Sequence, residues 1–266
     1  MVKEFASHHY WALILGGSSG LGLAAARKLA MHGMNICIVH RDTRVDMERI
    51  NSDFQDIRAY GVQVLAYNAD AVNAGKRQEV LAALKVAMGD KGRVRTVVHS
   101  IAKGNLKAMN SDNARLSTDD FHITLGNMAI SLYDWTQELV EQQLFAPDAR
   151  VLSFTSEGSS KAWKHYGAVA AAKAALESIS RQIALEFAPL GLRANCIQAG
   201  VTDTRSMQQI PGSEHIITYT KQRNPFHRLT TPEDVANAVY LLCKDEAAWI
   251  NGAVIPVNGG EHISQA

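Results

Sequence analysis

Short apolar runs alternate along the chain with longer amphipathic stretches, a pattern typical of a parallel sheet with crossover helices. The apolar runs predict seven strands, at Ala12–Leu15, Asn35–His40, Val62–Tyr67, Val94–His99, Arg150–Phe154, Arg193–Ile197 and Ala253–Val257. Helices are expected between them, because apolar residues recur at helical spacing, as from Met47 to Ile57. A further helix start is predicted at Thr231-Pro232, which combines a hydroxyl cap with a proline in the first turn.

Because crossovers between parallel strands are right-handed, this order predicts an α/β fold over residues 1–266. We expect a single, Rossmann-like, doubly wound domain with a seven-stranded parallel sheet and helices on both faces. A chain of 266 residues with 47% apolar composition is long enough to bury one large core. Ligands of such sheets bind beyond the carboxyl ends of the strands, and every motif described below falls at one of those ends.

A glycine-rich turn follows the first predicted strand and opens a helix at Leu23–His32. It runs Gly16-Gly17-Ser18-Ser19-Gly20-Leu21-Gly22. Gly16 and Gly20 let the backbone approach phosphate oxygens, and Gly22 allows the helix to pack closely on the strand. A purely structural turn would also use glycines. Strand, loop and helix in this order nevertheless predict a binding site for a dinucleotide pyrophosphate.

The end of the second predicted strand, Val39-His40-Arg41-Asp42, is where the adenosine ribose of a dinucleotide would lie. A carboxylate alone there would repel a 2′-phosphate, whereas Arg41 is placed to meet one. We therefore predict NADPH as the coenzyme, with NADH as the alternative, since Asp42 could partly neutralise Arg41 or Arg41 could be a solvated charge. Asp70, at the end of the third strand, suits the adenine amino group or, equally, a turn or helix cap.

A tyrosine and a lysine lie on nearly the same face of the helix predicted from Tyr166 to Phe187. Tyr166 and Lys173 are seven residues apart, which is about two turns, or roughly 10 Å along the axis. Small residues between them leave room for a nicotinamide ribose, which Lys173 could hold while Tyr166 reaches a substrate oxygen. The lysine charge is also expected to favour the ionised tyrosine. Taken alone, the pair could be a surface lysine and an interfacial tyrosine.

Three segments together resemble a known family. The Tyr166-x6-Lys173 spacing replaces the Tyr-x3-Lys of mainstream short-chain dehydrogenases and resembles the enoyl-thioester (enoyl-acyl-carrier-protein) reductases, a divergent branch of that family. The run Val98-His99-Ser100-Ile101-Ala102 is similar to the His-Ser-Ile segment of that branch. Ala199 stands where the wider family usually has proline. The resemblance covers the chain from about Trp11 to Gly260.

Two departures resemble one NADPH-using subgroup of the enoyl reductases. The glycine loop keeps the mainstream spacing, and Ser156 stands where many of these enzymes carry a second tyrosine. Asn127 lies one residue out of register with the catalytic asparagine of the mainstream family, and we interpret it as structural.

The resemblance implies a set of site residues. For the coenzyme these are Gly16, Ser18, Ser19, Gly20, Leu21, Gly22, Arg41, Asp70, Ala71, Ser100, Ile101, Ala102, Lys173, Ala199, Gly200, Thr202 and Thr204. For catalysis they are Tyr166, Lys173 and Ser156, and for the substrate Gly104, Ser156, Tyr166 and Met207. No metal site is expected, because the histidines and cysteines show no metal-ligand spacing.

The implied function is hydride transfer from NAD(P)H to a trans-2-enoyl thioester in fatty-acid synthesis, with Tyr166 donating a hydrogen bond to the thioester oxygen. Two alternatives stay open, because a fold alone does not choose among them. One is an NADPH-dependent carbonyl, ketoacyl or hydroxy-compound oxidoreductase that uses Thr155 or Ser156 with Tyr166. The other is a non-catalytic NADP-binding sensor.

A substrate lid is expected at about 204–223, over an acyl chain, although a plain surface helix is equally open. Its apolar residues are Met207, Ile210, Ile216, Ile217 and Tyr219. The substrate is expected as a thioester of acyl-carrier protein or of coenzyme A. Basic residues that could face an acidic carrier, or be dispersed surface charge, are Lys161, Lys164, Lys221, Arg223 and Arg228. The family resemblance implies a homotetramer, for which Leu176–Phe187 offers an apolar face.

Composition narrows the class of partner. With 27 Lys+Arg against 26 Asp+Glu, bulk charge indicates neither nucleic acid nor a membrane surface. No apolar run approaches the length of a membrane span, and residues 1–12 lack the long apolar stretch of a signal peptide. Cys37, Cys196 and Cys243 are scattered and odd in number, which predicts reduced, buried thiols and a cytoplasmic location.

Overall fold

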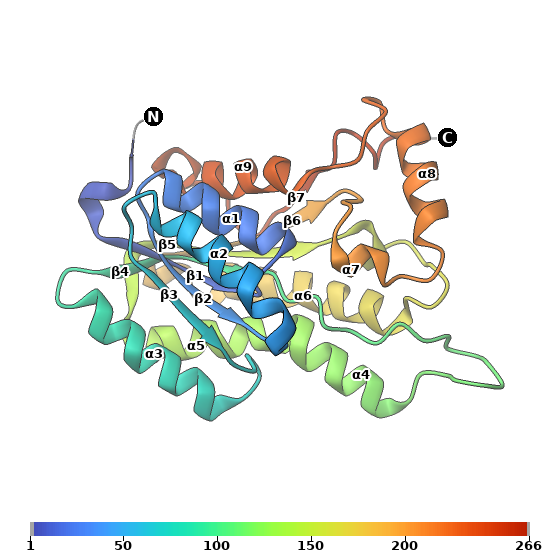
Figure 1. Cartoon of the computed structure of the whole chain (residues 1–266), viewed down its shortest axis with the longest axis horizontal. Helices are drawn as coiled ribbons and strands as arrows, with labels where there is room; N and C mark the ends of the chain where they lie inside the picture. The colour runs from blue at the N-terminus through green and yellow to red at the C-terminus, as the bar shows by residue number, and fades with distance from the viewer. Residues whose placement is uncertain (1–2, 265–266) are drawn as a thin grey trace.

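A seven-stranded parallel sheet, in the order β3-β2-β1-β4-β5-β6-β7, organises the chain (Figure 1). The computed structural model describes residues 3–264. The strands are β1 (Tyr10–Leu15), β2 (Asn35–His40), β3 (Val64–Asn68), β4 (Arg93–His99), β5 (Phe145–Thr155), β6 (Leu192–Ala199) and β7 (Val254–Val257). The prediction of a doubly wound parallel α/β sheet is confirmed. β1 and β4 are adjacent although two strands intervene in sequence, so the switch point of the sheet lies between them.

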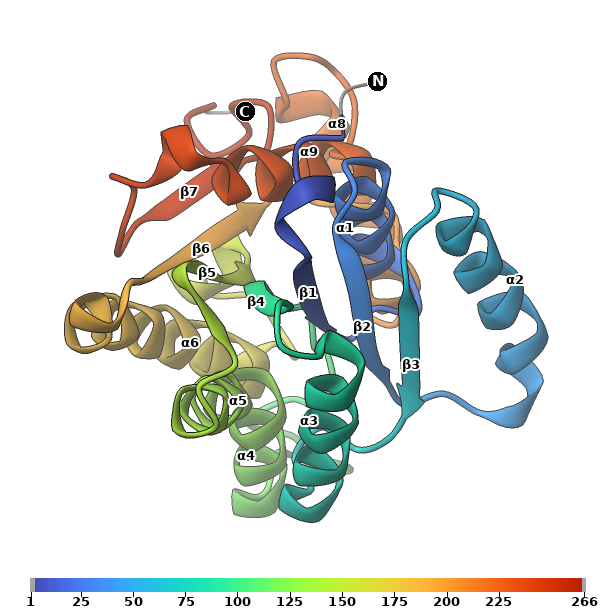
Figure 2. The ribbon, with the colours of Figure 1, turned by 90° about the vertical axis from the view of Figure 1, so that its left-hand side faces the viewer.

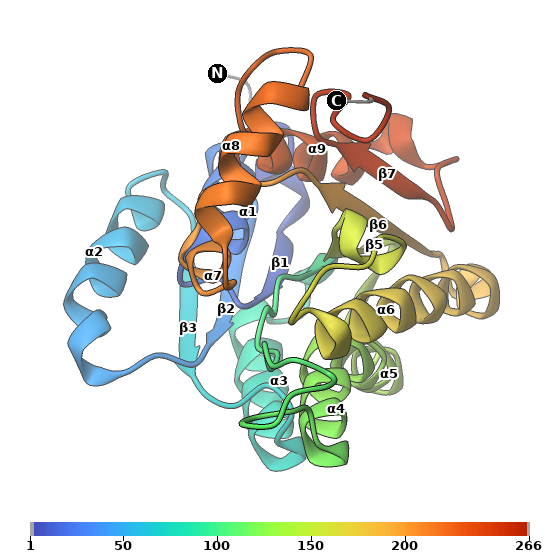
Figure 3. The ribbon, with the colours of Figure 1, turned by 90° about the vertical axis from the view of Figure 1, so that its right-hand side faces the viewer.

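Helices cover both faces of this sheet (Figure 2). One face carries α1 (Gly20–Met31), α2 (Met47–Arg58) and α9 (Pro232–Cys243), and the other carries α3 (Ala74–Met88), α4 (Thr118–Leu125), α5 (Ser131–Glu141) and α6 (Gly167–Glu186). Two further helices, α7 (Arg205–Gln208) and α8 (Ser213–Arg223), lie beyond the carboxyl ends of the strands, in front of the sheet in Figure 3.

The alternation of side chains in the central strand explains why two apolar cores form. In β1, Ala12 and Ile14 pack into the core beneath α1, whereas Leu13 and Leu15 pack into the core beneath α3. All four side chains are fully buried. A strand that is buried on both faces reads as a continuous apolar run, which is why the sequence pattern locates it well.

Strand β5 begins five residues earlier than predicted, because its first part contains buried charge. Arg95 of β4 and Arg150 of β5 are both about 1% exposed, and both donate hydrogen bonds to the carboxylate of Asp148. They also donate to the carbonyl oxygens of Cys243 and Leu242 at the end of α9, where a helix favours cations. Of these charges only Asp148 lies in the part of β5 that was not predicted, where it and Pro147 interrupt the apolar run.

The predicted start of α9 is confirmed. The Thr231 hydroxyl accepts the amide N–H of Asp234 at 3.2 Å, and the Asp234 carboxylate accepts the amide N–H of Thr231 at 2.9 Å. The three cysteines are free and buried, as expected. Within residues 3–264 no group of acidic, histidine and cysteine side chains could hold a metal ion, and no helix there is long and apolar enough to span a membrane.

Candidate active site

A cavity of about 670 Å³ lies at the carboxyl ends of the strands, at the edge where the sequence motifs converge. It is lined by the loops that follow β1 to β6 and by the residues of α7. Of the predicted site residues, those that line it are Gly16, Ser18, Ser19, Gly20, Leu21, Arg41, Asp70, Ala71, Ser100, Ile101, Ala102, Gly104, Ser156, Tyr166, Lys173, Ala199, Gly200, Thr202, Thr204 and Met207.

Gly22 does not line the cavity and is a correction to the predicted coenzyme contacts. A Cβ at this position would collide with the carbonyl oxygen of Gly16, so the absent side chain lets α1 pack onto the glycine loop. Gly22 therefore shapes the site without bordering it.

The glycine loop has the form that an anion requires. Gly16 has φ +86°, and a Cβ there would lie only 2.5 Å from the carbonyl oxygen of Ser100 in the loop after β4. Ser19, the N-cap of α1, makes no side-chain hydrogen bond to the first amide groups of that helix. Unsatisfied N–H groups at a helix start attract phosphate, so this loop fits the pyrophosphate of a dinucleotide.

The adenosine end of the cavity differs from expectation in its charge pairing. Arg41 pairs with Asp70 at 2.6 Å, and Asp42 instead pairs with His40 at 2.9 Å. The expectation that Asp42 neutralises Arg41 is therefore wrong, and Asp70 does so. Asp70 also accepts the amide N–H of Val72 at 3.3 Å, which is the turn role left open by the sequence. The Arg41 side chain is 55% exposed and remains within reach of a ligand phosphate.

Tyr166 and Lys173 both reach the cavity from the beginning of α6. Tyr166 is the N-cap residue of this helix, and both side chains are buried. Lys173 Nζ donates a hydrogen bond to the carbonyl oxygen of Phe154 at 2.6 Å, which anchors it at the end of β5. An ammonium has two further donors, which are available to a ribose. Burial lowers the pKa of Lys173 to about 8.

The expected effect of the Lys173 charge on Tyr166 is not among the causes of the shift in the pKa of the phenol. Burial raises the pKa of Tyr166 above its ordinary value, and the nearby Ser156 hydroxyl only partly offsets this. At neutral pH the phenol is therefore protonated and can donate a hydrogen bond. A Cβ at Gly158 would collide with the Tyr166 ring, so this glycine makes room for the tyrosine.

The two hydroxyls considered for carbonyl chemistry have different surroundings. Thr155 Oγ1 donates to the carboxylate of Glu177 at 2.6 Å, so this hydroxyl is already engaged. Ser156 Oγ is buried and has no hydrogen-bond partner among residues 3–264. A buried, unpaired hydroxyl in a cavity wall is able to bind a ligand oxygen.

A hydrogen-bonded chain behind the cavity was not anticipated from the sequence. The Ser131 hydroxyl donates to the carbonyl oxygen of Asn127 at 2.7 Å, and His99 Nε2 lies 2.8 Å from that hydroxyl. Asn127 sits in a π-helical turn, and its side chain donates to the carbonyl of Ile123, which agrees with a structural role. Burial lowers the pKa of His99 to about 3, so this imidazole is neutral. The His-Ser-Ile segment was the only sequence signal for it.

The end of the cavity beside Tyr166 is apolar. Its lining residues there are Leu106, Met128, Trp163, Val169, Met207 and Ile210. Met207 and Ile210 face the cavity as the lid prediction expected. Ile216, Ile217 and Tyr219 are not among the lining residues, which favours the alternative of a plain surface helix for this part of the segment. Sequence periodicity gave no means of finding Leu106, Met128 or Trp163.

The five basic residues considered for the cavity mouth have different surroundings. Arg223 is buried and pairs with Glu157 and Glu261. Lys161 pairs with Glu157, and Arg228 pairs with Asp234. Of the five basic residues, Lys164 and Lys221 are exposed and form no ion pair among the described residues.

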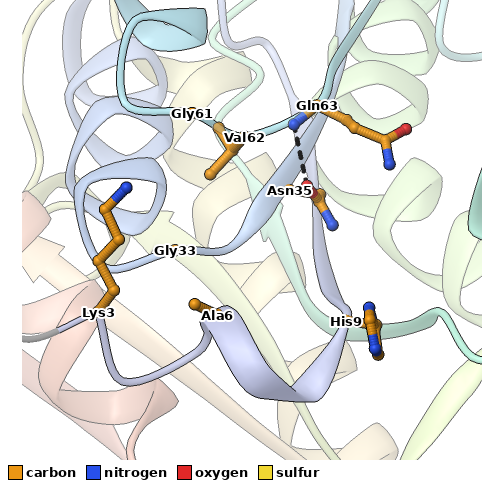
Figure 4. A pocket seen from close by; sticks show the side chains of 8 residues that line it. All are labelled: Lys3, Ala6, His9, Gly33, Asn35, Gly61, Val62 and Gln63. Atoms are coloured by element: carbon orange, nitrogen blue, oxygen red, sulfur yellow. Dashed lines mark hydrogen bonds between the residues drawn. The ribbon is translucent and has the colours of Figure 1, made fainter.

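A second hollow, of about 370 Å³, lies at the opposite edge of the sheet (Figure 4). Lys3, His9, Asn35 and Gln63 are among its lining residues, and Asn35 Oδ1 accepts the amide N–H of Gln63 at 2.9 Å. It holds none of the motifs described above. The candidate chemistry therefore belongs to the larger cavity.

The same arrangement occurs in known proteins. The family described as enoyl-(acyl carrier protein) reductase matches residues 16–262. An enoyl-acyl-carrier-protein reductase (NADH) from Aquifex aeolicus is 33% identical over 172 residues, which span 65% of this chain and 63% of that relative. The crystal structure of an enoyl-acyl-carrier-protein reductase (NADH) from Aquifex aeolicus superimposes with a TM-score of 0.83 at 26% identity, covering 97% of this chain and 98% of that one.

A relative of a different printed activity is also similar over nearly the whole chain. An NADPH-dependent aldehyde reductase-like protein from Arabidopsis thaliana is 28% identical and covers 94% of this chain and 93% of its own. The names of the two relatives point to different reduced groups, an enoyl thioester and an aldehyde.

The lowered pKa of Lys173 predicts a pH dependence for coenzyme binding. Below pH 8 the ammonium is charged and would donate to the ribose of a bound coenzyme, whereas above pH 8 it loses its proton. The dissociation constant of NADPH, measured by fluorescence titration between pH 7 and 9.5, should rise by about tenfold through this range, since one charge-assisted hydrogen bond is lost. Lys173→Arg stays charged and should remove the dependence. The same rise in that variant would show that another group titrates.

Proposed function

The chain belongs to the enoyl-(acyl carrier protein) reductase family of the short-chain dehydrogenases/reductases, and we propose that it reduces trans-2-enoyl thioesters with NADPH. Membership makes it an NAD(P)H-dependent reductase. The observation that carries the narrower proposal is a buried, protonated Tyr166 at the apolar end of the cavity, with Lys173 on the coenzyme side. The non-catalytic NADP-binding sensor considered from the sequence is set aside, because Tyr166 and Lys173 are both present in the cavity, one as a proton donor and the other as a cation.

The residues of the cavity suit the coenzyme in three places. The amide groups at the start of α1 would hold the pyrophosphate, and Lys173 would hold the nicotinamide ribose. Arg41 would meet a 2′-phosphate after release from Asp70. When bound, the coenzyme supplies a hydride to the substrate. The Aquifex aeolicus relative is named for NADH. NADPH is nevertheless proposed for this chain, because the charge of Arg41 suits a 2′-phosphate.

Tyr166 performs the proton chemistry in this proposal. Addition of hydride at the β-carbon of an enoyl thioester moves negative charge to the thioester oxygen as an enolate. The protonated phenol donates a hydrogen bond to that oxygen and stabilises the charge where it develops. The α-carbon then takes up a proton, which gives the saturated thioester. Because burial raises the pKa of Tyr166, the phenol keeps its proton until the oxyanion forms.

The shape of the substrate end favours an acyl chain. Met128, Trp163 and Val169 form an apolar wall next to Tyr166, and Met207 of α7 closes it from the lid. A hydrocarbon tail gains free energy by leaving water for such a surface, at about 25 cal/mol per Å² buried. The thioester group of the substrate needs only one or two hydrogen-bond partners in this part of the cavity.

The carrier of the thioester and the assembly of the protein are parts of the same proposal. Lys164 and Lys221 are the exposed cations that could attract an acidic carrier protein, and coenzyme A is the alternative. A homotetramer is proposed from the family. The apolar face expected in Leu176–Phe187 is partly used inside the chain, since Leu176 and Ile183 are buried, while Leu185 is exposed.

Ser156 favours carbonyl reduction as a second candidate function. Its hydroxyl is buried without a partner and lies close enough to Tyr166 to lower the pKa of the phenol. Two hydroxyls that converge on one ligand oxygen suit a ketone or aldehyde, and the Arabidopsis thaliana relative is named for aldehyde reduction. Thr155 is no longer a candidate for this role, because it is bonded to Glu177.

Removal of the Tyr166 hydroxyl tests the proposed reaction. Tyr166→Phe should lower kcat with crotonyl thioester and NADPH by about 10²–10³-fold, since it deletes the donor to the developing oxyanion. The dissociation constant of NADPH should not change. Turnover is followed as NADPH consumption, in parallel with a ketoacyl thioester. Rapid reduction of the ketoacyl thioester by wild type, with none of the crotonyl thioester, would replace the proposal by the second candidate.

Removal of the Arg41 side chain tests the proposed preference for NADPH over NADH. Arg41→Ala should raise KM for NADPH by about tenfold, the value of one charge-assisted phosphate contact, and leave KM for NADH within twofold. Both constants are measured with the same acyl substrate. Arg58→Ala is the matched control, because Arg58 ends α2, donates to the carbonyl oxygen of Val64 at 3.2 Å and does not line the cavity. An Arg41→Ala variant with unchanged KM for NADPH would remove the assignment.

A further inference from the structure

One buried guanidinium joins three segments of the site wall that are far apart in sequence. Arg223, the last residue of α8, is 8% exposed. Its Nη2 lies 2.5 Å from a carboxylate oxygen of Glu157 and 2.6 Å from one of Glu261. The two carboxylates are only 6% and 2% exposed, so all three charges are held away from water. Such a cluster keeps one geometry, because its separation would leave Arg223 and Glu261 as unpaired charges in the interior, whereas Glu157 would keep its ion pair with Lys161.

Each of the two carboxylate residues is connected to the wall of the cavity. Glu157 follows Ser156 directly and itself lines the cavity, and its carbonyl oxygen accepts the amide N–H of Lys161 at 2.8 Å. Glu261 Oε2 accepts the amide N–H of Val201 at 3.3 Å. Val201 belongs to the loop after β6 and lines the coenzyme side of the cavity. The Tyr166 side and the coenzyme side of the site are therefore joined through Arg223.

The two ends of the lid differ sharply in how they are held. The carboxyl end of α8 is fixed by the buried Arg223. Helix α7 is held across the cavity by an ion pair between Arg205 and Asp46 at 2.8 Å, in which Arg205 is 63% exposed. Exposed pairs of this kind contribute little stability, because water screens the two charges. Between them, Gly212 has φ +80° and has no neighbour within 4 Å of a built Cβ.

We propose that Arg223 is a positioning residue that sets the Ser156–Glu157 turn against Tyr166 and anchors α8, so that the lid opens at α7 and pivots near Gly212. Met207, which faces the cavity from α7, then moves with the opening part, while the turn that carries Ser156 stays in place. The expected effect of Arg223 on kcat rests on the proposed function, but its effect on the order of the three segments does not. Arg223 touches neither substrate nor coenzyme and acts through Glu157 and Glu261.

Hydrogen–deuterium exchange of the full chain without substrate tests this coupling. In Arg223→Met, exchange should become about tenfold faster or more at three amides together: Lys161, Val201 and Asn224. These amides are bonded to the carbonyl of Glu157, the carboxylate of Glu261 and the carbonyl of Thr220. Amides of β1 and β4 should keep wild-type rates. Arg223→Lys, which keeps the charge, should restore part of the protection.

Lys221→Met is the matched control, because Lys221 lies on the same helix, is exposed and forms no ion pair among the described residues. It should leave all three amides unchanged. Faster exchange confined to α8 would overturn the proposal, since Arg223 would then be a local helix anchor. An equal increase in β1 and β4 would also overturn it. If Arg223→Met does not fold, Glu261→Gln tests the same coupling through Val201 and Asn224, with the same two contrary outcomes.

A kinetic measurement adds the link to catalysis. Arg223→Met should lower kcat with crotonyl thioester by about tenfold, and it should also raise the dissociation constant of NADPH, since Val201 on the coenzyme side is loosened as well. Loss of coenzyme affinity with unchanged kcat would contradict positioning of the Ser156–Glu157 turn. If wild type does not reduce enoyl thioesters, the proposed function fails, whereas the exchange experiment still decides the role of Arg223.

Discussion

The site depends on the removal of one phenol and one ammonium from water at the beginning of α6. Burial lowers the pKa of Lys173 and raises the pKa of Tyr166, so both groups are shifted toward their neutral forms. The ammonium is kept in place by the carbonyl oxygen of Phe154, and the phenol has room because residue 158 is glycine. A tyrosine that stays protonated can donate a hydrogen bond to a substrate oxygen on which negative charge develops. The cavity beside it is apolar, so such an acceptor would interact with it strongly.

The remainder of the fold brings a dinucleotide to this pair. The switch point between β1 and β4 places the glycine loop against Ser100, close enough that a side chain at Gly16 would not fit. The loop after β6 completes the coenzyme side, and the Arg223 cluster joins it to the turn that carries Ser156. Helix α7 borders the same cavity with Met207. The sheet is thus a scaffold on which loops with separate tasks are held at fixed distances.

The sequence predicts those features that depend on local patterns. Strands such as β2 and the start of α9 follow from burial on two faces and from the capping residues, and the Tyr-x6-Lys spacing locates the catalytic pair. Features that depend on contacts between distant residues are not predicted. Arg223 meets partners 66 and 38 residues away, and Arg41 pairs with Asp70 across two strands instead of with the adjacent Asp42. The ionisation of Tyr166 was misjudged because spacing reveals a neighbouring charge but does not reveal burial, which has the larger effect here.

The central claim, that the protonated Tyr166 serves the reduction of a carbon–carbon double bond, is tested most directly by following the hydrogen atoms. NADPH that carries deuterium at both C4 positions of the nicotinamide is supplied together with crotonyl and ketoacyl thioesters, and the products are examined by proton and deuterium NMR. The account predicts a butyryl thioester with one deuterium at the β-carbon and a solvent hydrogen at the α-carbon. Deuterium found instead at the carbinol carbon of a hydroxyacyl thioester, with the crotonyl thioester unchanged, would contradict it.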